Sequence, residues 1–497
     1  MRVPKPSTKS VDPASVEAGA LVVVLEPGEK PPHAGHPAIG PHVEAFERAV
    51  ESGKSTAHWF CTMDSTAKCR SRHLLVESAG LGPWAPGREG TKAASARAVA
   101  GCRKHGIASL AFLLPGEDPT GRAVELLEGA VLGDWTDTRF RSSGQREALR
   151  LQFIAPKGEE RRVKAALARA ATILEGVLLA RELVNAPNNL LTPDALARAA
   201  RRVAKDGGLK ATVLDEKKIQ ERGLNLLWNV GRGCEHPPRV AILEHRPRKP
   251  ATKAHVVLLG KGVTFDTGGY CIKGRDVMHK MNCDMGGAAA VVGAMQAIAA
   301  LKLPVRVTAI IGAAHNAIDG ASFTPGSILE SKSGRTVYIE NTDAEGRLIL
   351  ADLLALAGEM KPDVIWDFAT LTGAAANALG PAFAALFTDD IEQNQILMAA
   401  GEASGDLLWP LPLWPEYEPS LAHPLADVNN MSSMGQKAGA TSAANFLRGF
   451  VPDGVQWAHM DIAGTAFDVN LRYFGAGATG FGVRLIVEAL RRMAGKD

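Results

Sequence analysis

The sequence predicts an α/β protein in which a largely parallel central sheet carries helices on both faces. Apolar, β-branched runs that read as buried strands alternate with longer segments of helical spacing, and this alternation favours parallel strands joined by crossover helices. The 497 residues are 46% hydrophobic and 22% charged, a globular composition that excludes a disordered or collagen-like chain. The expected strands are 255–260, 304–313 and 362–371, and the expected helices are 284–301 and 344–360.

The first third of the chain has the same rhythm of strand and helix patterns. The polar stretch up to about residue 18 predicts a loose tail. The run 20–26 predicts a buried strand, and residues 42–53 have the spacing of a helix that stops at Gly53. Because the alternation continues to about residue 115, we expect a first α/β domain, in which no catalytic motif is visible.

A long amphipathic helix pattern over residues 162–184 follows this first domain. Beyond it, Thr192, Pro193 and Asp194 form a helix start, with a hydroxyl cap, a proline and an acidic residue in succession. The predicted organisation is an N-terminal α/β domain at 1–160, a linker helix at 161–190 and a larger α/β domain with a mixed, largely parallel sheet at 191–497.

Charge and cysteine content favour a cytoplasmic protein. The chain has 56 basic and 53 acidic residues, a net charge of +3, which gives no strong field for nucleic acid or a membrane. Its six cysteines form no C-x-x-C pair, so a disulfide framework is not expected. Neither an apolar leader nor a run of about 18 apolar residues is visible in the sequence.

The basic stretch 245–253 allows two interpretations. Its arginines and lysines could contact a phosphate backbone, or the stretch could be a solvated loop between two strands. The solvated loop is favoured, because the chain as a whole is nearly neutral.

Candidate chemistry concentrates in two segments, 260–287 and 341–347. Each places acidic residues after the end of a predicted strand, and ligands of α/β proteins bind beyond the carboxyl ends of strands. Any one of these acids could be an ordinary turn residue. Four that converge cannot all stay ionised without compensation, and two divalent cations are the natural compensation. The four acids are Asp266, Asp284, Asp343 and Glu345.

Three basic residues accompany these acids. Lys261 and Lys273 could each be a neutral amine that binds metal or an ammonium that stabilises a developing oxyanion. Arg347 lies in the first turn of a predicted helix, where the helix N-terminus and a guanidinium together suit a carboxylate-like anion.

These segments resemble the leucine aminopeptidase family of two-metal cytosolic enzymes. Residues 341–347 read NTDAEGR, the family signature, and GKGVTFDTGG precedes Lys273 and a DMGG motif at Asp284 with the family's spacing. Further family motifs, such as LVNAPNNLLTP and AHMDIAGTAF, occur in the same order. The resemblance covers about residues 175–490 and implies a catalytic metallopeptidase domain, preceded by a macro-like α/β domain over 1–160.

The resemblance also implies an activity and its residues. Such enzymes remove N-terminal residues, preferably Leu and other apolar residues, from short peptides by means of a water bridged by two metal ions. Lys261, Asp266, Asp284 and Glu345 would hold one ion, Mn²⁺ or Zn²⁺, and Asp266, Asp343 and Glu345 would hold the other. Lys273 would polarise the scissile carbonyl, and Arg347 would bind a bicarbonate that serves as general base.

The resemblance also implies which residues contact the substrate and how the chains assemble. Residues expected at the substrate are Met281, Thr370, Leu371, Gly373, Ala463 and Ala466, with the carbonyl of Leu371 facing the free amine. The family's homohexamer, a dimer of trimers with inward-facing sites, would restrict substrates to short peptides.

The sequence departs from the family pattern at His279, Lys280 and Cys283, although every proposed ligand is kept. His279 could be a further ligand, but a surface position or one behind the ligands is favoured, and Cys283 is expected to be a small packed residue. Two alternatives stay open: a DNA-binding or regulatory role supported only by the basic stretch, and a non-catalytic assembly protein, which the intact ligand set disfavours.

Overall fold

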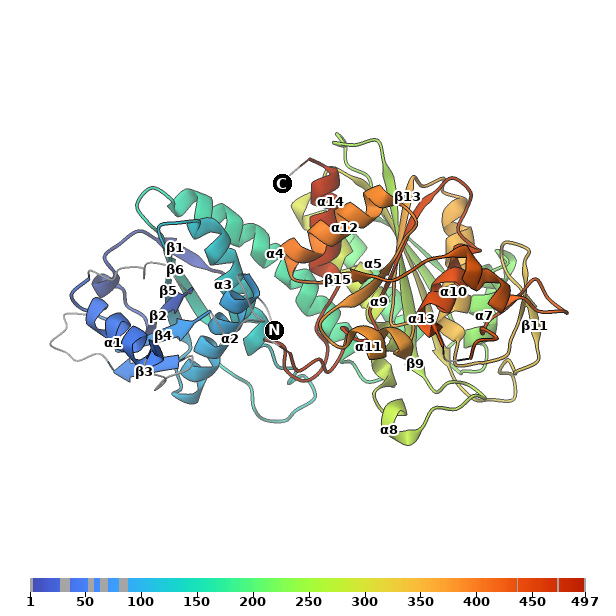
Figure 1. Ribbon diagram of the computed structural model, residues 1–497, viewed down its shortest axis with the longest axis horizontal. Coiled ribbons are helices and arrows are strands. Elements are labelled where there is room, and N and C mark those ends of the chain that lie inside the picture. Colours follow the sequence, from blue (N-terminus) through green and yellow to red (C-terminus); the bar gives the residue numbers. More distant parts are fainter. Residues whose placement is uncertain are drawn as a thin grey trace. The chain divides into compact units, whose positions relative to one another are not determined.

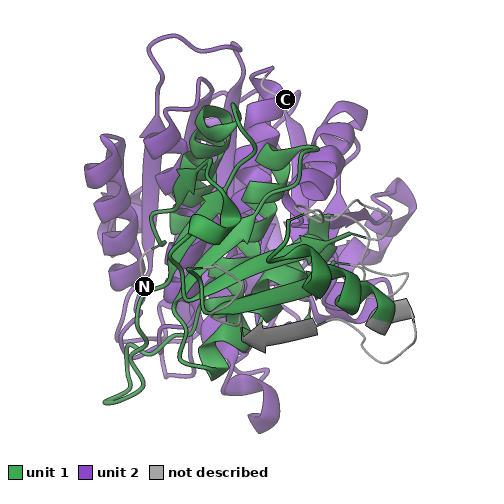
Figure 2. Cartoon of the chain, turned by 90° about the vertical axis from the view of Figure 1, so that its left-hand side faces the viewer, with its two compact units in different colours: residues 1–175, 470–475 green, residues 176–469, 476–497 purple. Residues whose placement is uncertain are grey.

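The computed structural model divides the chain into two compact units (Figures 1 and 2). Unit 1 comprises residues 1–175 and 470–475, and unit 2 comprises residues 176–469 and 476–497. The predicted domain limits near 160 and 190 stay a prediction. The structure describes residues 3–26, 36–51, 58–62, 70–79, 88–435, 437–471 and 473–495, and the side chains of 49–51 and 58–62 are outside this description.

Unit 1 contains a six-stranded sheet in the order β1-β6-β5-β2-β4-β3. All neighbours are parallel except β3 and β4. Apolar residues of the central strands, such as Leu21, Val23 and Val76, form its core. The elements are β1 (Ser7–Lys9), η1 (Pro13–Ser15), β2 (Ala20–Leu25), α1 (Gly40–Glu51), β3 (His58–Thr62), β4 (His73–Ser78), α2 (Arg88–Lys104), β5 (Ser109–Leu113), α3 (Pro119–Asp134), β6 (Arg150–Ile154) and α4 (Glu160–Val184), which continues into unit 2.

The structure corrects one expectation here. The loose tail is wrong for residues 7–9, because β1 pairs in parallel with β6, Ser7 opposite Gln152. A three-residue edge strand has too little periodicity to be visible in a polar sequence. The expected helix end at Gly53 lies outside the described residues, whereas α4 agrees with the pattern at 162–184.

Unit 2 contains an eight-stranded mixed sheet in the order β15-β14-β17-β13-β9-β10-β8-β7. The four strands β17, β13, β9 and β10 form its parallel centre. Its elements are α5 (Pro193–Gly207), β7 (Lys210–Leu214), α6 (Glu216–Glu221), α7 (Asn225–Gly231), β8 (Arg239–His245), β9 (His255–Asp266), α8 (Arg275–Met278), η3 (Met281–Met285), α9 (Gly286–Leu301), β10 (Arg306–Asn316), β11 (Ile328–Glu330), β12 (Thr336–Tyr338), α10 (Glu345–Gly358), β13 (Val364–Ala369), α11 (Gly373–Leu379), β14 (Ala384–Phe387), α12 (Ile391–Ser404), β15 (Leu408–Pro410), η4 (Pro415–Leu421), β16 (Val428–Asn429), α13 (Gly439–Arg448), β17 (Gln456–Asp461) and α14 (Val483–Met493).

Helices cover both faces of this sheet, which confirms the predicted fold class. In Figure 1, α5, α9 and α14 lie on one side of the sheet and α7, α10 and α13 on the other. Helix α5 begins at the predicted cap, where the Thr192 hydroxyl accepts a hydrogen bond from the amide of Ala195. The strands β11, β12 and β16 form a separate small sheet.

Successive residues of strand β9 face opposite helical layers. A Cβ on Gly260 or Gly262 would come within 3.3 Å of Ala288 in α9. Lys261, between them, faces the first turn of α10, where a Cβ on Gly346 would lie 2.7 Å from its Cε. The two-residue period of a strand therefore aims the lysine at α10 while the glycines admit α9.

The segment Met281–Leu301 is the one stretch, among the described residues, that is long and apolar enough to cross a membrane. Inside the structure 83% of its most apolar window is buried, as in a core helix of a soluble protein. Its hydropathy therefore reflects packing against β9 and β13.

Candidate metal centre

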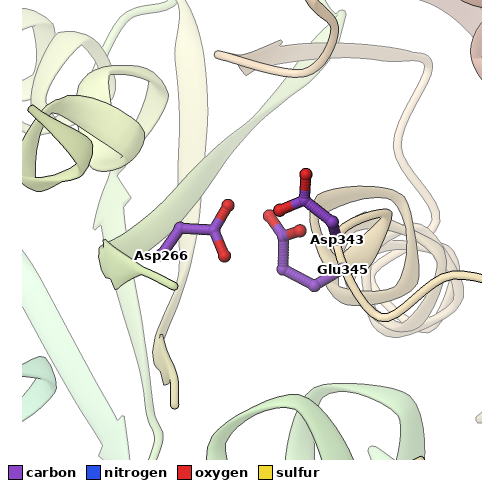
Figure 3. Close-up of side chains that lie close together, drawn as sticks. All are labelled: Asp266, Asp343 and Glu345. Atoms are coloured by element: carbon purple, nitrogen blue, oxygen red, sulfur yellow. The ribbon is translucent and has the colours of Figure 1, made fainter. Parts of the chain in front are cut away.

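Three carboxylates converge where β9 ends and α10 begins. Asp266 is the last residue of β9, Glu345 is the first of α10, and Asp343 precedes Glu345 by two residues. Figure 3 shows their side chains pointing toward one another, and one oxygen of each lies within 4.8 Å of the others. The structure therefore brings three of the four predicted carboxylates together.

Lys261 joins the fourth predicted acid to this group. Its Nζ lies 2.8 Å from Asp284 Oδ1 and 2.9 Å from Glu345 Oε1, and donates a hydrogen bond of 2.8 Å to the carbonyl of Thr370. The side chain is only 3% exposed. Burial alone lowers the pKa of Lys261, but Asp284 and Glu345 outweigh it and raise that pKa above its ordinary value.

Lys273 reaches the other side of the cluster. Its Nζ lies 2.8 Å from Asp266 Oδ2 and 2.5 Å from Asp343 Oδ1, and it is 16% exposed. The chain returns toward Asp343 at Gly268, which has φ +85° and where a Cβ would lie 2.5 Å from the carbonyl of Cys271. Only glycine fits this turn, and the turn places Lys273 over the carboxylates.

The site is short of positive charge. Burial, followed by the neighbouring carboxylates, raises the pKa of Asp343 to about 7 and raises that of Asp284 well above its ordinary value. Asp284 Oδ2 is buried and has no hydrogen-bond partner within the part of the chain that the structure describes. A cluster of carboxylate oxygens with an excess of negative charge fits divalent cations.

Arg347 lies beside the cluster and is 7% exposed. Its Nη1 donates a 2.6 Å hydrogen bond to the carbonyl of Asn430, and its guanidinium lies 6.0 Å from the ring centre of Phe446. Burial lowers the pKa of Arg347 to about 10, although Glu345 opposes this. Its Nε is buried without a partner among the described residues, which leaves a donor for an anion at the start of α10.

Two asparagines support these residues and were not predicted. Asn316, the last residue of β10, donates from Nδ2 to Asp266 Oδ1 at 2.8 Å and to the carbonyl of Thr342 at 3.1 Å. Asn430 accepts the amide of Glu340 at 2.9 Å. The one signal in the sequence was that Asn316 closely follows the predicted strand 304–313; its position opposite Asp266 comes from the pairing of β10 with β9.

Two of the residues expected at the substrate, Thr370 and Ala466, lie at the start of α9. The Thr370 hydroxyl donates to Asp284 Oδ1 at 2.7 Å. A Cβ on Gly286 would meet the side chains of Thr370 and Ala466 at 3.3 and 3.2 Å, so these two residues lie close together. The remaining positions are Met281 at the start of η3, Leu371 and Gly373 around the start of α11, and Ala463 after β17.

The residues that depart from the family pattern lie outside the carboxylate cluster. His279 is exposed, and its Nδ1 lies 3.3 Å from the carbonyl of Arg275. Lys280 is also exposed and pairs with Asp468 at 2.8 Å. Burial, followed by Asp284, raises the pKa of the Cys283 thiol to about 12, so the thiol is held protonated. The basic stretch begins at His245, the buried last residue of β8, and continues as a largely exposed loop to β9.

Comparisons with known proteins agree with this geometry. Residues 178–487 match the model of the cytosol aminopeptidase family, catalytic domain. A probable cytosol aminopeptidase of Syntrophotalea carbinolica is 41% identical over 433 residues, covering 85% of this chain and 86% of its own. One of Solibacter usitatus is 37% identical over 473 residues, covering 95% and 96%.

A solved structure extends the similarity to the fold. The bottromycin maturation enzyme BotP, in complex with Mn, is 34% identical, with a TM-score of 0.82. The match covers 96% of this chain and 100% of that chain.

Proposed function

The chain belongs to the cytosol aminopeptidase family and is a metal-dependent aminopeptidase; we propose that it removes N-terminal residues, preferably Leu or another apolar residue, from short peptides. The observation that carries the proposal is the convergence of Asp266, Asp343 and Glu345 at the end of β9. It supplies carboxylates that would bridge two cations, at the edge of the sheet where α/β enzymes bind ligands.

Four carboxylates and one lysine would hold two divalent cations, Mn²⁺ or Zn²⁺. Lys261, Asp266, Asp284 and Glu345 would hold one, and Asp266, Asp343 and Glu345 the other. Two cations held there would polarise the peptide carbonyl and lower the pKa of a water between them. The ammonium of Lys261 keeps its proton because of the surrounding carboxylates. Cations that neutralise those carboxylates would remove this effect and favour the amine.

Lys273 would act on the substrate's carbonyl oxygen. Its ammonium is already oriented by Asp266 and Asp343 and remains partly exposed. Without bound cations these carboxylates, acting against burial, raise the pKa of Lys273. With cations bound, the 16% exposure of Lys273, against 3% for Lys261, would favour its charged form. A fixed cation at a developing oxyanion lowers the barrier without reorganisation.

Arg347 would position a bicarbonate. One guanidinium nitrogen is committed to Asn430, and Nε is free to donate, at a helix start that favours anions. Bicarbonate bound there would supply a proton acceptor of suitable basicity close to the metal centre.

The pocket for the substrate's first side chain would be lined by Met281, Thr370, Gly373, Ala463 and Ala466, with the Leu371 carbonyl facing the free amine. Its small and apolar lining suits Leu or Met. We further propose that the protein is a cytoplasmic homohexamer. Light scattering would test the oligomeric state, because a hexamer has six times the chain mass of 52.5 kDa.

Hydrolysis of Leu-p-nitroanilide by the purified protein loaded with Mn²⁺ or Zn²⁺ tests the proposal. We expect activity that a chelator abolishes, bicarbonate stimulates and Glu345→Ala removes. If metal-loaded wild type is inactive, and Glu345→Ala is equally stable and equally inactive, the aminopeptidase proposal is wrong. Salt-dependent duplex binding without hydrolysis would instead support the nucleic-acid role of the 245–253 loop.

A further inference from the structure

Asp461, the last residue of β17, holds two turns together beside the proposed pocket. Its Oδ1 accepts the amide of Leu371 at 3.0 Å and the amide of Ala463 at 3.2 Å. Its Oδ2 accepts the hydroxyl of Thr372 at 2.6 Å. The residue is 1% exposed, so these three donors take the place of water around a buried carboxylate.

The two turns leave the same edge of the sheet. Strands β13 and β17 are parallel neighbours, with Ala369 opposite Asp461. The turn 370–372 follows β13, and the turn 462–466 follows β17. Asp461 is therefore the carboxylate that bonds to both turns at once.

Packing also brings the first residue of one turn close to the last residue of the other. Thr370 and Ala466 both lie against Gly286. A Cβ on Gly464 would lie 2.6 Å from the carbonyl of Gly380 and 3.2 Å from Ala376 Cα, so the second turn packs on α11. Thr372 is also the N-cap of α11, where its hydroxyl accepts the amide of Ala375 at 3.1 Å.

We propose that Asp461 is a positioning residue that sets the width of the pocket for the substrate's first side chain, and so the preference among apolar N-terminal residues. This rests on the proposed function, in which the pocket is lined by Thr370 and Gly373 from the segment after β13 and by Ala463 and Ala466 from the segment after β17, as its two walls. Among the described residues, Asp461 is the one buried carboxylate that accepts hydrogen bonds from both turns. A displacement of about 1 Å between walls is enough to change turnover strongly.

The experiment compares Asp461→Asn with Asp352→Asn in the full-length, Mn²⁺-loaded protein. Asp352 is a matched control, because it is buried and accepts the amides of Leu227 at 3.1 Å and Lys332 at 2.8 Å, but contacts neither turn. The substrates are the p-nitroanilides of Leu, Ala and Phe, and metal content and unfolding temperature are measured for each variant.

For Asp461→Asn we expect kcat/KM for the Leu substrate to fall about tenfold or more. The Leu:Ala and Leu:Phe ratios should each change at least fivefold, at unchanged metal content. For Asp352→Asn the ratios should stay within twofold of wild type. Thr372→Ser, which keeps the hydroxyl, should preserve the ratios, and Thr372→Val should shift them in the direction of Asp461→Asn.

A uniform loss on all three substrates, or unchanged ratios, would show that Asp461 has only a structural role. If wild type hydrolyses none of the substrates, the aminopeptidase proposal fails by itself. Amide hydrogen exchange then tests whether Asp461 holds the two turns in place. Faster exchange at Leu371 and Ala463 in Asp461→Asn, but not in Asp352→Asn, supports it, and unchanged exchange overturns it.

Discussion

At the scale of single residues, small side chains decide where the charges of the site lie. Gly346 follows Glu345 in the first turn of α10, and a Cβ there would lie 2.7 Å from both Cε and Nζ of Lys261. The missing methyl group leaves the space in which the lysine meets Asp284 and Glu345. A residue that looks like a helix-weakening glycine is thus part of the site.

Gly346→Ala should therefore lower stability and Mn²⁺ affinity. In an ordinary helix the same change raises stability by about 1 kcal/mol, because alanine has the higher helix propensity. Here the methyl group would displace the Lys261 ammonium from its three acceptors. Thermal unfolding and Mn²⁺ titration measure both effects. In a Lys261→Ala background the loss of stability should be smaller, and an equal loss in both backgrounds would contradict the steric explanation.

Asn316→Ala should weaken Mn²⁺ binding by about 10- to 100-fold, the range found when a residue that orients a metal ligand is removed. The change deletes the 2.8 Å hydrogen bond that fixes Asp266 and the bond to Thr342. Asn229→Ala is the control, because this buried side-chain amide in α7 donates to the carbonyl of Asn225, at 2.8 Å, and lies outside the proposed site. Equal Mn²⁺ affinity of the two variants would exclude the positioning role of Asn316.

At the scale of elements, β9 begins with a residue buried in the sheet and ends with a carboxylate of the site. It starts at His255, which is buried and has its Nε2 2.9 Å from the Thr308 hydroxyl of β10, and it ends at Asp266. Its parallel pairing with β10 and β13 brings the ends of all three strands to one edge, where the site is built. The pairing that stabilises the sheet therefore also positions the carboxylates of the site.

His255 should make unit 2 sensitive to acid. Burial, followed by Arg306, lowers the pKa of His255 from 6.5 to about 4. The unfolded chain thus takes up a proton below pH 6.5 that the folded chain does not, so stability falls as the pH drops from about 6.5 to 4 and levels off below that. The loss attributable to this one group is about 3 kcal/mol.

Chemical denaturation of wild type and His255→Gln between pH 7 and 4 measures this effect as a difference. The gap in the free energy of unfolding between the two proteins should close by about 3 kcal/mol over this range, because only wild type carries the titrating imidazole. A constant gap, or a histidine signal that titrates near 6.5 in the folded protein, would refute the assignment.

At the scale of the whole molecule, metal binding and folding should be coupled. Three buried carboxylates and the half-buried Asp343 outnumber the two lysines of the site, so cations that bind only the folded state add to its stability. At a free Mn²⁺ concentration about 100 times Kd, the added stability is about 2.7 kcal/mol.

Scanning calorimetry with and without a chelator checks this coupling. The transition assigned to unit 2 should move to higher temperature with excess Mn²⁺ and return with the chelator. Glu345→Ala, which removes a proposed bridging ligand, should show little response. An unfolding temperature that is indifferent to Mn²⁺ would count against a metal centre in this cluster.

The sequence by itself determined the α/β class, the buried strands and the cap at Thr192, because these depend on local periodicity and on the chemistry of neighbouring residues. It also indicated where the carboxylates gather, since strand ends and helix starts can be read locally. The tertiary structure alone decided the pairing of residues 7–9 and the partners of the site. Asn316 meets Asp266 from 50 residues away, and Asp461 meets Leu371 from 90. Such contacts depend on strand order and register, which no local pattern encodes.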